Sequence, residues 1–433
     1  MLIWWILEVF PIFITALLPM VFFPALEILN LQETFMPYGS PIVFLFLGGF
    51  IIALAMEERR LHERISYGLI RLTGTKPRQI ILGFMIATAL VAMWISNTAT
   101  AVMLLPIALS VSKLLGEQSK DEQLLQRFRL LLMLGIAYAA NIGGTMTLIG
   151  TPPNLVFAGY YYETFGVDFP FSRWFIFGLP TGGILLFLTY QLLTRILYPI
   201  GGSEIEGVKE LIQKKWKEMG RISRAEGSVL VVFTITVLLW VFAQPLNDLM
   251  GVRALNNTNI AMFGGVAMFV VPVNWSEGEF ILDWKSTVKL PWGILILFGG
   301  GLTMAKGLET AGIIQSIGEF FANNTDLSPF ALVLLLTTFA VFATELMSNV
   351  ALVTVLLPVV IGIGKSTNVD PLLLAIPVTL AASCAFMMPI STPPNAVVYS
   401  SGYVSVKQMM RAGFWLNIIS IAVITLICYL ILG

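Results

Sequence analysis

The chain has 433 residues, of which 57% are apolar and only 12% are charged, and its mean hydropathy is +0.86. Soluble globular chains carry about 25% charged residues, so this composition excludes a soluble enzyme, a disordered chain and a nucleic-acid-binding protein. Lysine plus arginine equals aspartate plus glutamate at 25 each, so neither a strongly acidic nor a strongly basic partner is implied. The composition predicts a polytopic membrane protein.

Apolar stretches follow one another along the whole chain. A membrane-spanning helix needs about 20 apolar residues. The stretches lie at 2–29, 41–56, 79–115, 129–161, 168–198, 226–246, 258–273, 291–305, 329–363, 370–403 and 412–432. We interpret the first as a span rather than a cleaved signal peptide. Because the chain enters it almost at once, we expect further cytoplasmic residues or another helix before it in a longer form of the protein.

Two segments between the spans, 57–78 and 199–224, are rich in arginine and lysine. The positive-inside rule places both on the cytoplasmic side. Within the second segment, apolar residues recur at helical spacing between charges, at Ile205, Val208, Ile212, Trp216 and Met219. This pattern predicts an amphipathic helix over 203–219 on the inner membrane surface. An ordinary solvated loop helix is the alternative.

Short motifs occur twice along the chain in the same order. Ser96-Asn97-Thr98 is matched by Ser348-Asn349-Val350, and Thr151-Pro152-Pro153-Asn154 is matched by Thr392-Pro393-Pro394-Asn395. A pair of glycines, Gly48-Gly49, likewise precedes the first set, and Gly299-Gly300-Gly301 precedes the second. Chance similarity between apolar segments yields matches of leucine and isoleucine, not polar motifs in register. The sequence therefore indicates an internal duplication.

The two repeats are predicted to have opposite orientations. We expect 79–115 and 329–363 to be re-entrant hairpins, each with its Ser-Asn motif at the tip. Five crossings then separate the starts of the repeats, and both basic segments fall inside. A full crossing at 79–115 would instead place 199–224 outside, against the positive-inside rule. In this topology the N-terminus is cytoplasmic and the C-terminus is outside.

The duplicated Thr-Pro-Pro-Asn motifs predict two broken helices. Proline lacks the backbone N–H that a continuing helix requires. Irregular backbone in a membrane is tolerated where it lines a cavity. The predicted fold is therefore an all-α polytopic membrane protein with inverted repeats, two re-entrant hairpins and two broken helices, an arrangement typical of secondary transporters. Kinks that serve packing alone are the alternative.

The residues at the breaks suggest the chemistry of the cargo. Hydroxyl and amide groups at the tips coordinate small cations and donate hydrogen bonds to carboxylates. Helix N-termini after the tips favour an anion, and freed carbonyls at Gly150 and Ser391 favour a cation. No lysine or arginine lies in these motifs, so an anionic substrate needs bound cations to offset its charge. This predicts cation-coupled anion transport, with helix capping as the alternative for each Ser-Asn pair alone.

Two ionisable residues, Glu345 and His62, lie near the tips or in the polar segments. Glu345, beside the second tip, is expected to orient the hairpin, relay a proton or face an aqueous vestibule, rather than to bind an anion. His62 lies in a charged segment and is expected to be solvated. No catalytic set of histidine, aspartate and serine, and no cluster of metal ligands, occurs in the spans. We therefore do not expect an enzyme, and Cys384 and Cys428 are too far apart in the sequence to indicate a disulfide framework.

These motifs resemble those of the divalent anion:sodium symporter family, which transports dicarboxylates, citrate and sulfate. The similarity covers nearly the whole chain. It is most specific at Met93–Thr100, at Thr344–Val350 and at Ser383–Pro389 leading into Thr392–Asn395. The resemblance implies a homodimer in which a transport domain moves against a scaffold domain by an elevator mechanism, in the cell (inner) membrane and in contact with its lipid.

The domain boundaries and site residues follow from this resemblance. The scaffold domain would comprise 1–40 and 168–290, the transport domain 41–167 and 291–411, and a final membrane helix 412–433. The resemblance implies a first sodium site at Ser96, Asn97 and the Gly150 carbonyl. It implies a second at Thr344, Asn349 and the carbonyls of Met347 and Ser391. The substrate carboxylates would meet Asn97, Thr98, Ser348, Asn349 and Thr392, with Pro393 nearby.

Two positions depart from the family pattern. Ala92 stands where a serine of the first sodium site is common, and Val350 replaces the second threonine of the paired motif. Valine also occurs at the second position in some carboxylate-transporting relatives. We expect a sodium-coupled importer of C4-dicarboxylates such as succinate, malate or fumarate. The alternatives are a sodium-independent dicarboxylate exchanger, a sulfate or citrate transporter and, from another class, an anion channel.

Overall fold

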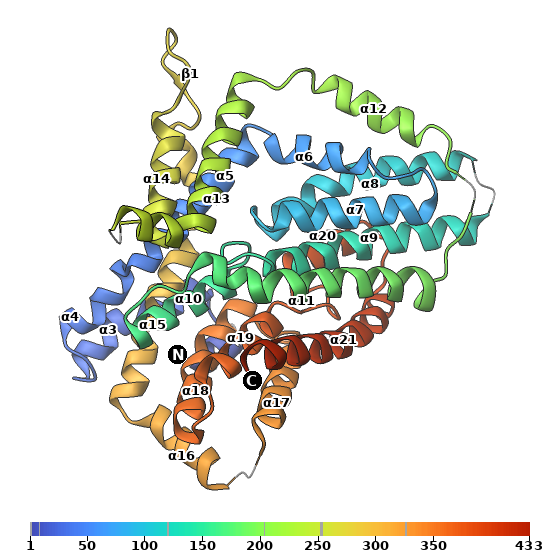
Figure 1. Cartoon of the computed structure of the whole chain (residues 1–433). Coiled ribbons are helices and arrows are strands. Elements are labelled where there is room, and N and C mark those ends of the chain that lie inside the picture. The colour runs from blue at the N-terminus through green and yellow to red at the C-terminus, as the bar shows by residue number, and fades with distance from the viewer. Residues whose placement is uncertain (1, 8, 119–120, 203, 252–253, 325–326) are drawn as a thin grey trace.

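The computed structural model describes residues 2–7, 9–118, 121–202, 204–251, 254–324 and 327–433 (Figure 1). Seven helical segments in this part of the chain are long and apolar enough to cross a membrane, and an eighth would be a helix pair bent by 65°. The seven lie at 31–58, 97–117, 122–145, 171–197, 224–250, 349–367 and 406–432. The chain is a helical polytopic membrane protein, as its composition predicted.

In the described residues, an N-terminal part is followed by two series of seven helices with a connecting region between them. The N-terminal part contains α1 (Leu2–Leu7), α2 (Ile12–Thr15), α3 (Leu18–Ala25), α4 (Leu31–Phe35) and the short helix η1 (Met36–Gly39). The first series contains α5 (Pro41–Glu58), α6 (Leu61–Ile70), α7 (Pro77–Ala92), α8 (Asn97–Gln118), α9 (Glu122–Thr145), α10 (Pro152–Phe165) and α11 (Phe171–Gln191). The second contains α15 (Trp292–Thr310), α16 (Ile313–Asn324), α17 (Pro329–Ala343), α18 (Asn349–Thr367), α19 (Pro371–Ala382), α20 (Pro393–Tyr399) and α21 (Val406–Leu432).

The connecting region holds peripheral elements. It consists of η2 (Leu192–Leu197), α12 (Val208–Glu218), α13 (Arg224–Met250), α14 (Asn257–Val270), β1 (Pro272–Asn274), β2 (Glu279–Phe280) and η3 (Trp284–Lys289). The two strands pair as a small antiparallel hairpin that projects beyond α14 (Figure 1) and was not predicted from the sequence. The amphipathic helix predicted over 203–219 is shorter: α12 has Val208 and Ile212 on its buried face, 204–207 are not helical, and 203 lies outside the described residues.

The element order of the two series agrees with the sequence repeat. In each series a long helix and a short helix are followed by two helices separated by a break, at 93–96 and at 344–348. The next two helices are separated by breaks at 146–151 and 383–392. By length, α8 and α18 are each also able to cross a membrane. Re-entrance of the two helix pairs therefore stays a prediction.

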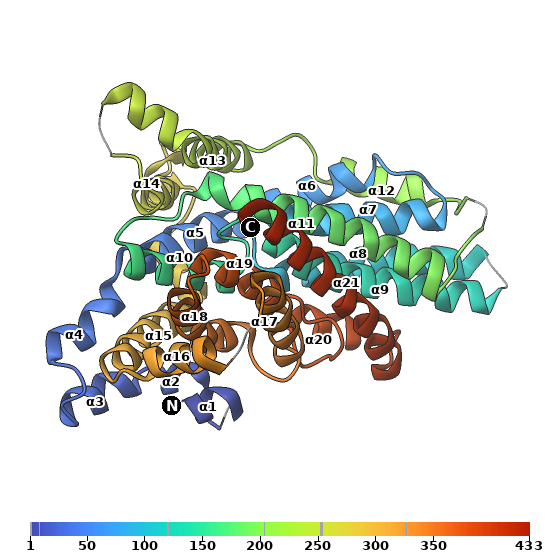
Figure 2. The ribbon, with the colours of Figure 1, turned by 60° about the horizontal axis from the view of Figure 1, so that its bottom comes forward.

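The two helices that precede the second break of each series, α9 and α19, are the most deeply buried. In α9, 94% of the most apolar 18-residue stretch is buried inside the protein, whereas only 22% of the corresponding stretch of α13 is buried. Every residue of α19 from Leu372 to Ala382 is buried. In both views α7, α8 and α9 lie side by side, while α13 and α14 lie at the periphery (Figure 1, Figure 2). The broken segments are thus held by the most deeply buried helices.

The helix that follows the second break of each series packs against the other series. The α10 helix of the first series packs against α18 and α19 of the second, and α20 packs against α8 and α9. The hydroxyl oxygen of Tyr160 on α10 lies within hydrogen-bond distance of the Gly301 and Thr354 carbonyl oxygens, at 2.9 and 3.1 Å. Each half of the chain therefore completes the core of the other.

Close helix contacts explain one of the repeated glycines. A Cβ atom at Gly48 on α5 would lie 2.5 Å from the backbone carbonyl oxygen of Ala261 on α14. A Cβ atom at Gly264 on α14 would lie equally close to the Thr236 hydroxyl oxygen on α13. Small residues allow the backbones of membrane helices to approach closely. These glycines therefore permit the tight packing of α5, α14 and α13.

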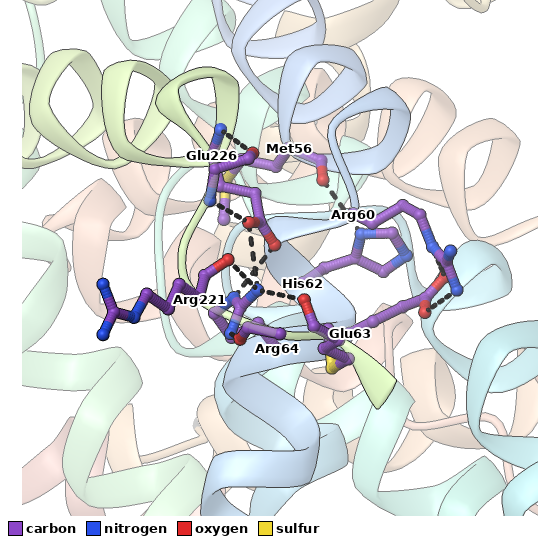
Figure 3. Close-up of polar contacts among 10 residues, drawn as sticks. Met56, Arg60, His62, Glu63, Arg64, Arg221 and Glu226 are labelled. Carbon is purple, nitrogen blue, oxygen red and sulfur yellow. Dashed lines mark hydrogen bonds and ion pairs between the residues drawn. The ribbon is translucent and has the colours of Figure 1, made fainter. Parts of the chain in front are cut away.

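The expectation that His62 is solvated is wrong. His62 is only 7% exposed, and its Nδ1 atom lies 2.9 Å from the Met56 carbonyl oxygen (Figure 3). Burial lowers the pKa of the imidazole, since a charged ring would lose its hydration. His62 therefore joins the end of α5 to α6 as a neutral hydrogen-bonding group. The charged residues around His62 suggested exposure to solvent. They did not indicate that the first turn of α6, which carries His62, lies against the end of α5.

Candidate functional site

A cavity of about 660 Å³ lies where the four helix breaks meet. Its walls contain residues of both tips and of both Thr-Pro-Pro-Asn motifs. Ten of the eleven predicted site residues line it, namely Ser96, Asn97, Thr98, Gly150, Met347, Ser348, Asn349, Ser391, Thr392 and Pro393. The eleventh, Thr344, lies behind Asn349 and is fully buried. The fold therefore gathers residues that are up to 297 positions apart in the sequence, from Ser96 to Pro393.

Four helices begin at the wall of this cavity. The first residues of α8, α10, α18 and α20 are Asn97, Pro152, Asn349 and Pro393, and all four line it. The N-terminal turn of a helix carries a partial positive charge and, in α8 and α18, backbone N–H groups. The α10 and α20 helices each begin with two prolines, which have no N–H, so these two contribute their dipole. Several such termini around one cavity create a positive potential without a charged side chain. The arrangement suits an anion.

Few charged side chains accompany these helix termini. Among the described residues that line the cavity, Lys289 is the only cation, and its side chain is 67% exposed. Its Nζ atom lies 2.7 Å from Glu58 Oε1, so its charge is partly offset. Glu57 and Glu345 also contribute to the wall. An anion deep in the cavity would therefore depend on helix termini and on any bound cations for charge compensation.

The first tip presents a buried oxygen without a partner. Ser96 Oγ accepts a hydrogen bond from the Ala99 N–H, at 3.1 Å, and so caps the start of α8. Asn97 Oδ1, in contrast, is buried and has no hydrogen-bond partner. Burying an unsatisfied polar atom costs about 1–3 kcal/mol. Such an atom in a polar cavity is a candidate ligand for a cation.

Two glycines make room for this oxygen and its neighbours. A Cβ atom at Gly144 would lie 2.6 Å from Asn97 Oδ1, and one at Gly150 would lie 3.0 Å from the Met93 carbonyl oxygen. The Gly150 position also faces the Gly144 carbonyl oxygen and the Thr147 hydroxyl oxygen. Several oxygens thus converge on a space that a side chain would fill. Oxygen-rich sites of this kind suit small hard cations.

The second tip is arranged differently. The hydroxyl oxygen of Thr344 lies 2.7 Å from Asn349 Oδ1 and 2.6 Å from the Ala382 carbonyl oxygen. The hydroxyl group has one proton, so it donates to one of these two acceptors at a time. Thr344 and Asn349 were both predicted for the second cation site, and the structure brings them into direct contact. Here the asparagine oxygen already has a hydrogen-bond partner, unlike that of Asn97.

The final asparagine of each Thr-Pro-Pro-Asn motif braces its own break. The side-chain amide of Asn154 donates to the carbonyl oxygens of Gly144 and Thr147, at 3.2 and 2.7 Å. In the second repeat Asn395 donates to those of Ala385 and Met388, at 3.1 and 3.0 Å. Carbonyl groups freed by a helix break require such partners in a buried environment. These asparagines therefore stabilise the irregular backbone beside the cavity.

Glu345 also holds the second break. Its carboxylate accepts hydrogen bonds from the N–H groups of Phe386, Met387 and Met388, at 2.7, 2.9 and 3.3 Å. The side-chain amide of Asn417 donates a further bond at 2.9 Å. Glu345 is 4% exposed. The sequence suggested that Glu345 orients its own hairpin, and the hydrogen bonds show that it also connects this tip to the broken segment at 386–388.

Asn141, Glu57 and Lys289 were not singled out from the sequence, and Asn141 lies buried among the polar contacts between the repeats. Asn141 on α9 lines the cavity, and its side-chain amide lies 3.1 Å from the Thr392 hydroxyl oxygen and 3.3 Å from the Ala385 carbonyl oxygen. The contact connects the first repeat to the break of the second. An asparagine inside an apolar helix is itself a signal, since polar residues in membrane helices form interhelical hydrogen bonds. Its partner, however, lies 251 positions away.

The chain is similar to known membrane proteins along nearly its whole length. A family model described as the sodium:sulfate symporter transmembrane region matches residues 1–432. A sodium-dependent dicarboxylate transporter of Staphylococcus saprophyticus is 41% identical over 432 residues, covering 98% of this chain and 83% of the relative. A protein of the same name from Staphylococcus aureus is 39% identical over 434 residues, covering 99% and 84%.

Solved structures show the same fold at low sequence identity. The YdaH transporter of Alcanivorax borkumensis has a TM-score of 0.64 and 13% identity, over 99% of this chain and 97% of that one. The MtrF efflux pump of Neisseria gonorrhoeae has a TM-score of 0.59 and 15% identity, over 92% and 83%. The similarity to these two transporters concerns architecture alone.

Proposed function

Because the chain belongs to the sodium:sulfate symporter family, as its motifs had suggested, we propose that it is a sodium-coupled importer of C4-dicarboxylates such as succinate, malate and fumarate. Membership places the chain among transporters rather than enzymes. The relatives that are 39–41% identical carry the name of sodium-dependent dicarboxylate transporters, which supports sodium as the coupling ion and a dicarboxylate as the cargo.

The observation that carries the proposal is the set of four helix N-termini around one cavity with little side-chain cation. A dianion bound there meets hydrogen-bond donors at Thr98, Ser348 and Thr392, and side-chain amides at Asn97 and Asn349. Pro393 starts α20 beside them. Half-helix N-termini facing an anion and freed carbonyls facing sodium are the usual arrangement in secondary transporters with broken helices. Sodium at the tips would supply the positive charge that the side chains lack.

Two sodium sites are assigned in this proposal. The first uses Ser96, the free Oδ1 atom of Asn97 and the Gly150 carbonyl. The second uses Thr344, Asn349 and the carbonyls of Met347 and Ser391. A cation at the second site requires the Thr344 hydroxyl to turn its proton toward Ala382, which frees Asn349 Oδ1. Sodium binding would then order both tips before the dianion enters.

The residues that line the cavity support a proposal for the side of the membrane that it faces. Gly49, Phe50, Ala53, Leu54 and Glu57 form one face of the second half of α5 and line the cavity to the end of that helix. The basic segment that follows α5 is cytoplasmic by the positive-inside rule. We therefore propose that the structure represents an inward-facing state.

The family resemblance also suggests how two copies of the chain assemble and move. We propose a homodimer in the cell membrane in which the domain of 41–167 and 291–411 moves against that of 1–40 and 168–290. The 412–433 helix ends outside. In this elevator mechanism, the four breaks and their cargo move together as one body.

The direct test is uptake of radiolabelled succinate into proteoliposomes containing the purified protein. The expected result is accumulation driven by an inward sodium gradient and lost when potassium replaces sodium. Uptake without sodium that requires internal dicarboxylate would indicate an exchanger. Failure of succinate under both conditions would contradict the proposal, and citrate and sulfate would then be tested. A continuous ion current without coupled uptake would indicate a channel.

Gly144→Ala is expected to raise the sodium concentration for half-maximal uptake by about tenfold, because overpacking of about 1–3 kcal/mol falls directly on the first sodium site. The added Cβ atom would press on Asn97 Oδ1. Gly183→Ala on α11 is the matched control, since a Cβ atom there meets nothing within 4 Å. Equal sodium dependence in the two variants would argue against a cation beside Gly144.

Val350→Thr is expected to retain dicarboxylate uptake and to change the order of preference among succinate, malate, fumarate and sulfate. Val350 lines the cavity next to Asn349, and a hydroxyl group there would add a hydrogen-bond donor to the substrate. Competition of unlabelled anions against labelled succinate measures the change, with Val350→Ala as the control without a donor. An unchanged preference would indicate that this side chain does not face the substrate.

A further inference from the structure

A second cavity, of about 810 Å³, lies at the predicted cytoplasmic surface between α12 and the α6–α7 turn. Its floor is apolar, formed by Ile80, Val208, Ile212 and other side chains of this region. The Ile205 N–H donates to the Thr75 carbonyl oxygen at 3.0 Å and ties the two segments together. The cavity is therefore built between two connected elements rather than on a bare loop.

The rim of this cavity is strongly basic. Arg71, Lys209 and Lys217 line it, against a single carboxylate at Glu204. The side chains of all three cations are exposed to solvent. No salt bridge is formed by them among the residues that the structure describes. Their charge is available to a phosphate group.

Cation–π contacts fix the wall formed by α12. The guanidinium group of Arg71 lies 4.6 Å from the centre of the Trp216 ring, and that of Arg64 lies 5.7 Å from it. Aromatic rings attract cations at such distances. Trp216 therefore holds α12 against α6 and presents Arg71 at the edge of the cavity.

A buried ion pair anchors the end of α12. Arg64 on α6 binds both oxygens of the Glu226 carboxylate, at 2.9 and 3.0 Å (Figure 3). It also donates to the carbonyl oxygens of Met219 and Gly220, at 3.1 Å each. Both side chains are only about a tenth exposed, at 11% and 9%. Bidentate pairs of this type fix geometry, so α12 is held in place without using the lysines of the cavity.

The surroundings identify the ligand class. Leu72 lines the cavity and is nevertheless 77% exposed, so an apolar side chain projects beside three cations. On the inner surface of a membrane, such a position meets acyl chains, while basic pockets bind anionic headgroups. We propose that this cavity binds the phosphate headgroup of an anionic phospholipid of the inner leaflet, with Arg71, Lys209 and Lys217 as its cationic contacts.

Native mass spectrometry of the full chain tests the proposal. The probes are phosphatidylglycerol and phosphatidylcholine with identical acyl chains, added to protein in detergent. We expect the unmodified protein to retain phosphatidylglycerol, and the Lys209→Gln/Lys217→Gln variant to bind it about tenfold more weakly, because each basic residue contributes measurably to anionic-lipid binding. The matched control is Lys214→Gln/Arg221→Gln, which removes two exposed charges of the same region that do not line the cavity.

Several outcomes separate this site from general surface charge. The Lys209→Arg/Lys217→Arg variant should bind phosphatidylglycerol like the unmodified protein. Equal losses in the two glutamine variants, or equal retention of both lipids, would overturn the proposal. Displacement of phosphatidylglycerol by inorganic phosphate would also overturn it and indicate a site for soluble phosphate. Succinate uptake does not enter this readout, so it is independent of the proposed transport function.

Discussion

Asn97→Ala is expected to abolish sodium-driven uptake while the protein remains folded. Asn97 Oδ1 is buried without a hydrogen-bond partner in the cavity, next to the glycines at 144 and 150. Removing an atom that already lacks a partner costs little stability, yet it removes a ligand from the first sodium site. Changes in the outer shell of metal sites weaken binding by about 10–100-fold, so loss of a direct ligand should reduce sodium affinity by at least the upper value.

The measurement compares the sodium dependence of succinate uptake with the thermal unfolding of the purified protein. Asn259→Ala serves as the matched control, because this asparagine is exposed and lies outside the cavity. Asn349→Ala is also expected to abolish uptake, but with some loss of stability, since Asn349 Oδ1 is bonded to Thr344. Normal sodium dependence in either variant would remove that residue from the proposed site.

Glu345→Ala is expected to destabilise the protein by about 3 kcal/mol or more and to eliminate uptake. The substitution deprives three backbone N–H groups and the Asn417 amide of their acceptor. Each buried donor left without a partner costs about 1–3 kcal/mol. The released segment carries Ser391 and Thr392, so the second sodium site and the substrate contacts lose their geometry together.

Glu345→Gln separates orientation from charge. The amide keeps one acceptor oxygen, so we expect stability between those of Glu345→Ala and the unmodified protein, and a raised half-maximal sodium concentration in uptake. Glu277→Ala, at an exposed position of the small hairpin, is the control for loss of a carboxylate. Unchanged unfolding of Glu345→Ala would contradict the role of this residue in holding the break.

Repetition made much of the site predictable from the sequence. A single Ser-Asn pair indicates no more than a helix cap, and Ser96 does cap α8. The second copy in register indicated a shared cavity. The eleven site residues came from the family resemblance, and ten of them line one cavity. Prolines likewise marked the starts of α10 and α20, because proline is tolerated at the first position of a helix but not in its interior.

Long-range partners were not predictable in the same way. The sequence gives no indication that Asn141 meets Thr392, or that Glu345 faces the backbone at 386–388, since these contacts depend on how the two series pack. Gly144 was not singled out from the sequence, and its importance arises from the neighbouring Asn97 oxygen. His62 was misassigned because local charge suggested solvent, whereas the α5–α6 junction buries it.

The exchange of α10 and α20 between the two series also constrains how the protein is made. The surface that α10 covers on α19 ends at Ala382, more than 200 residues after α10 itself ends at Phe165. At a synthesis rate of about 5–20 residues per second, α10 waits roughly 10–40 s for its partner to emerge from the ribosome. During that interval the first half lies in the bilayer as an incomplete bundle. Its maturation therefore depends on the insertion machinery, or on lipid, to shield the open surface until translation is nearly complete.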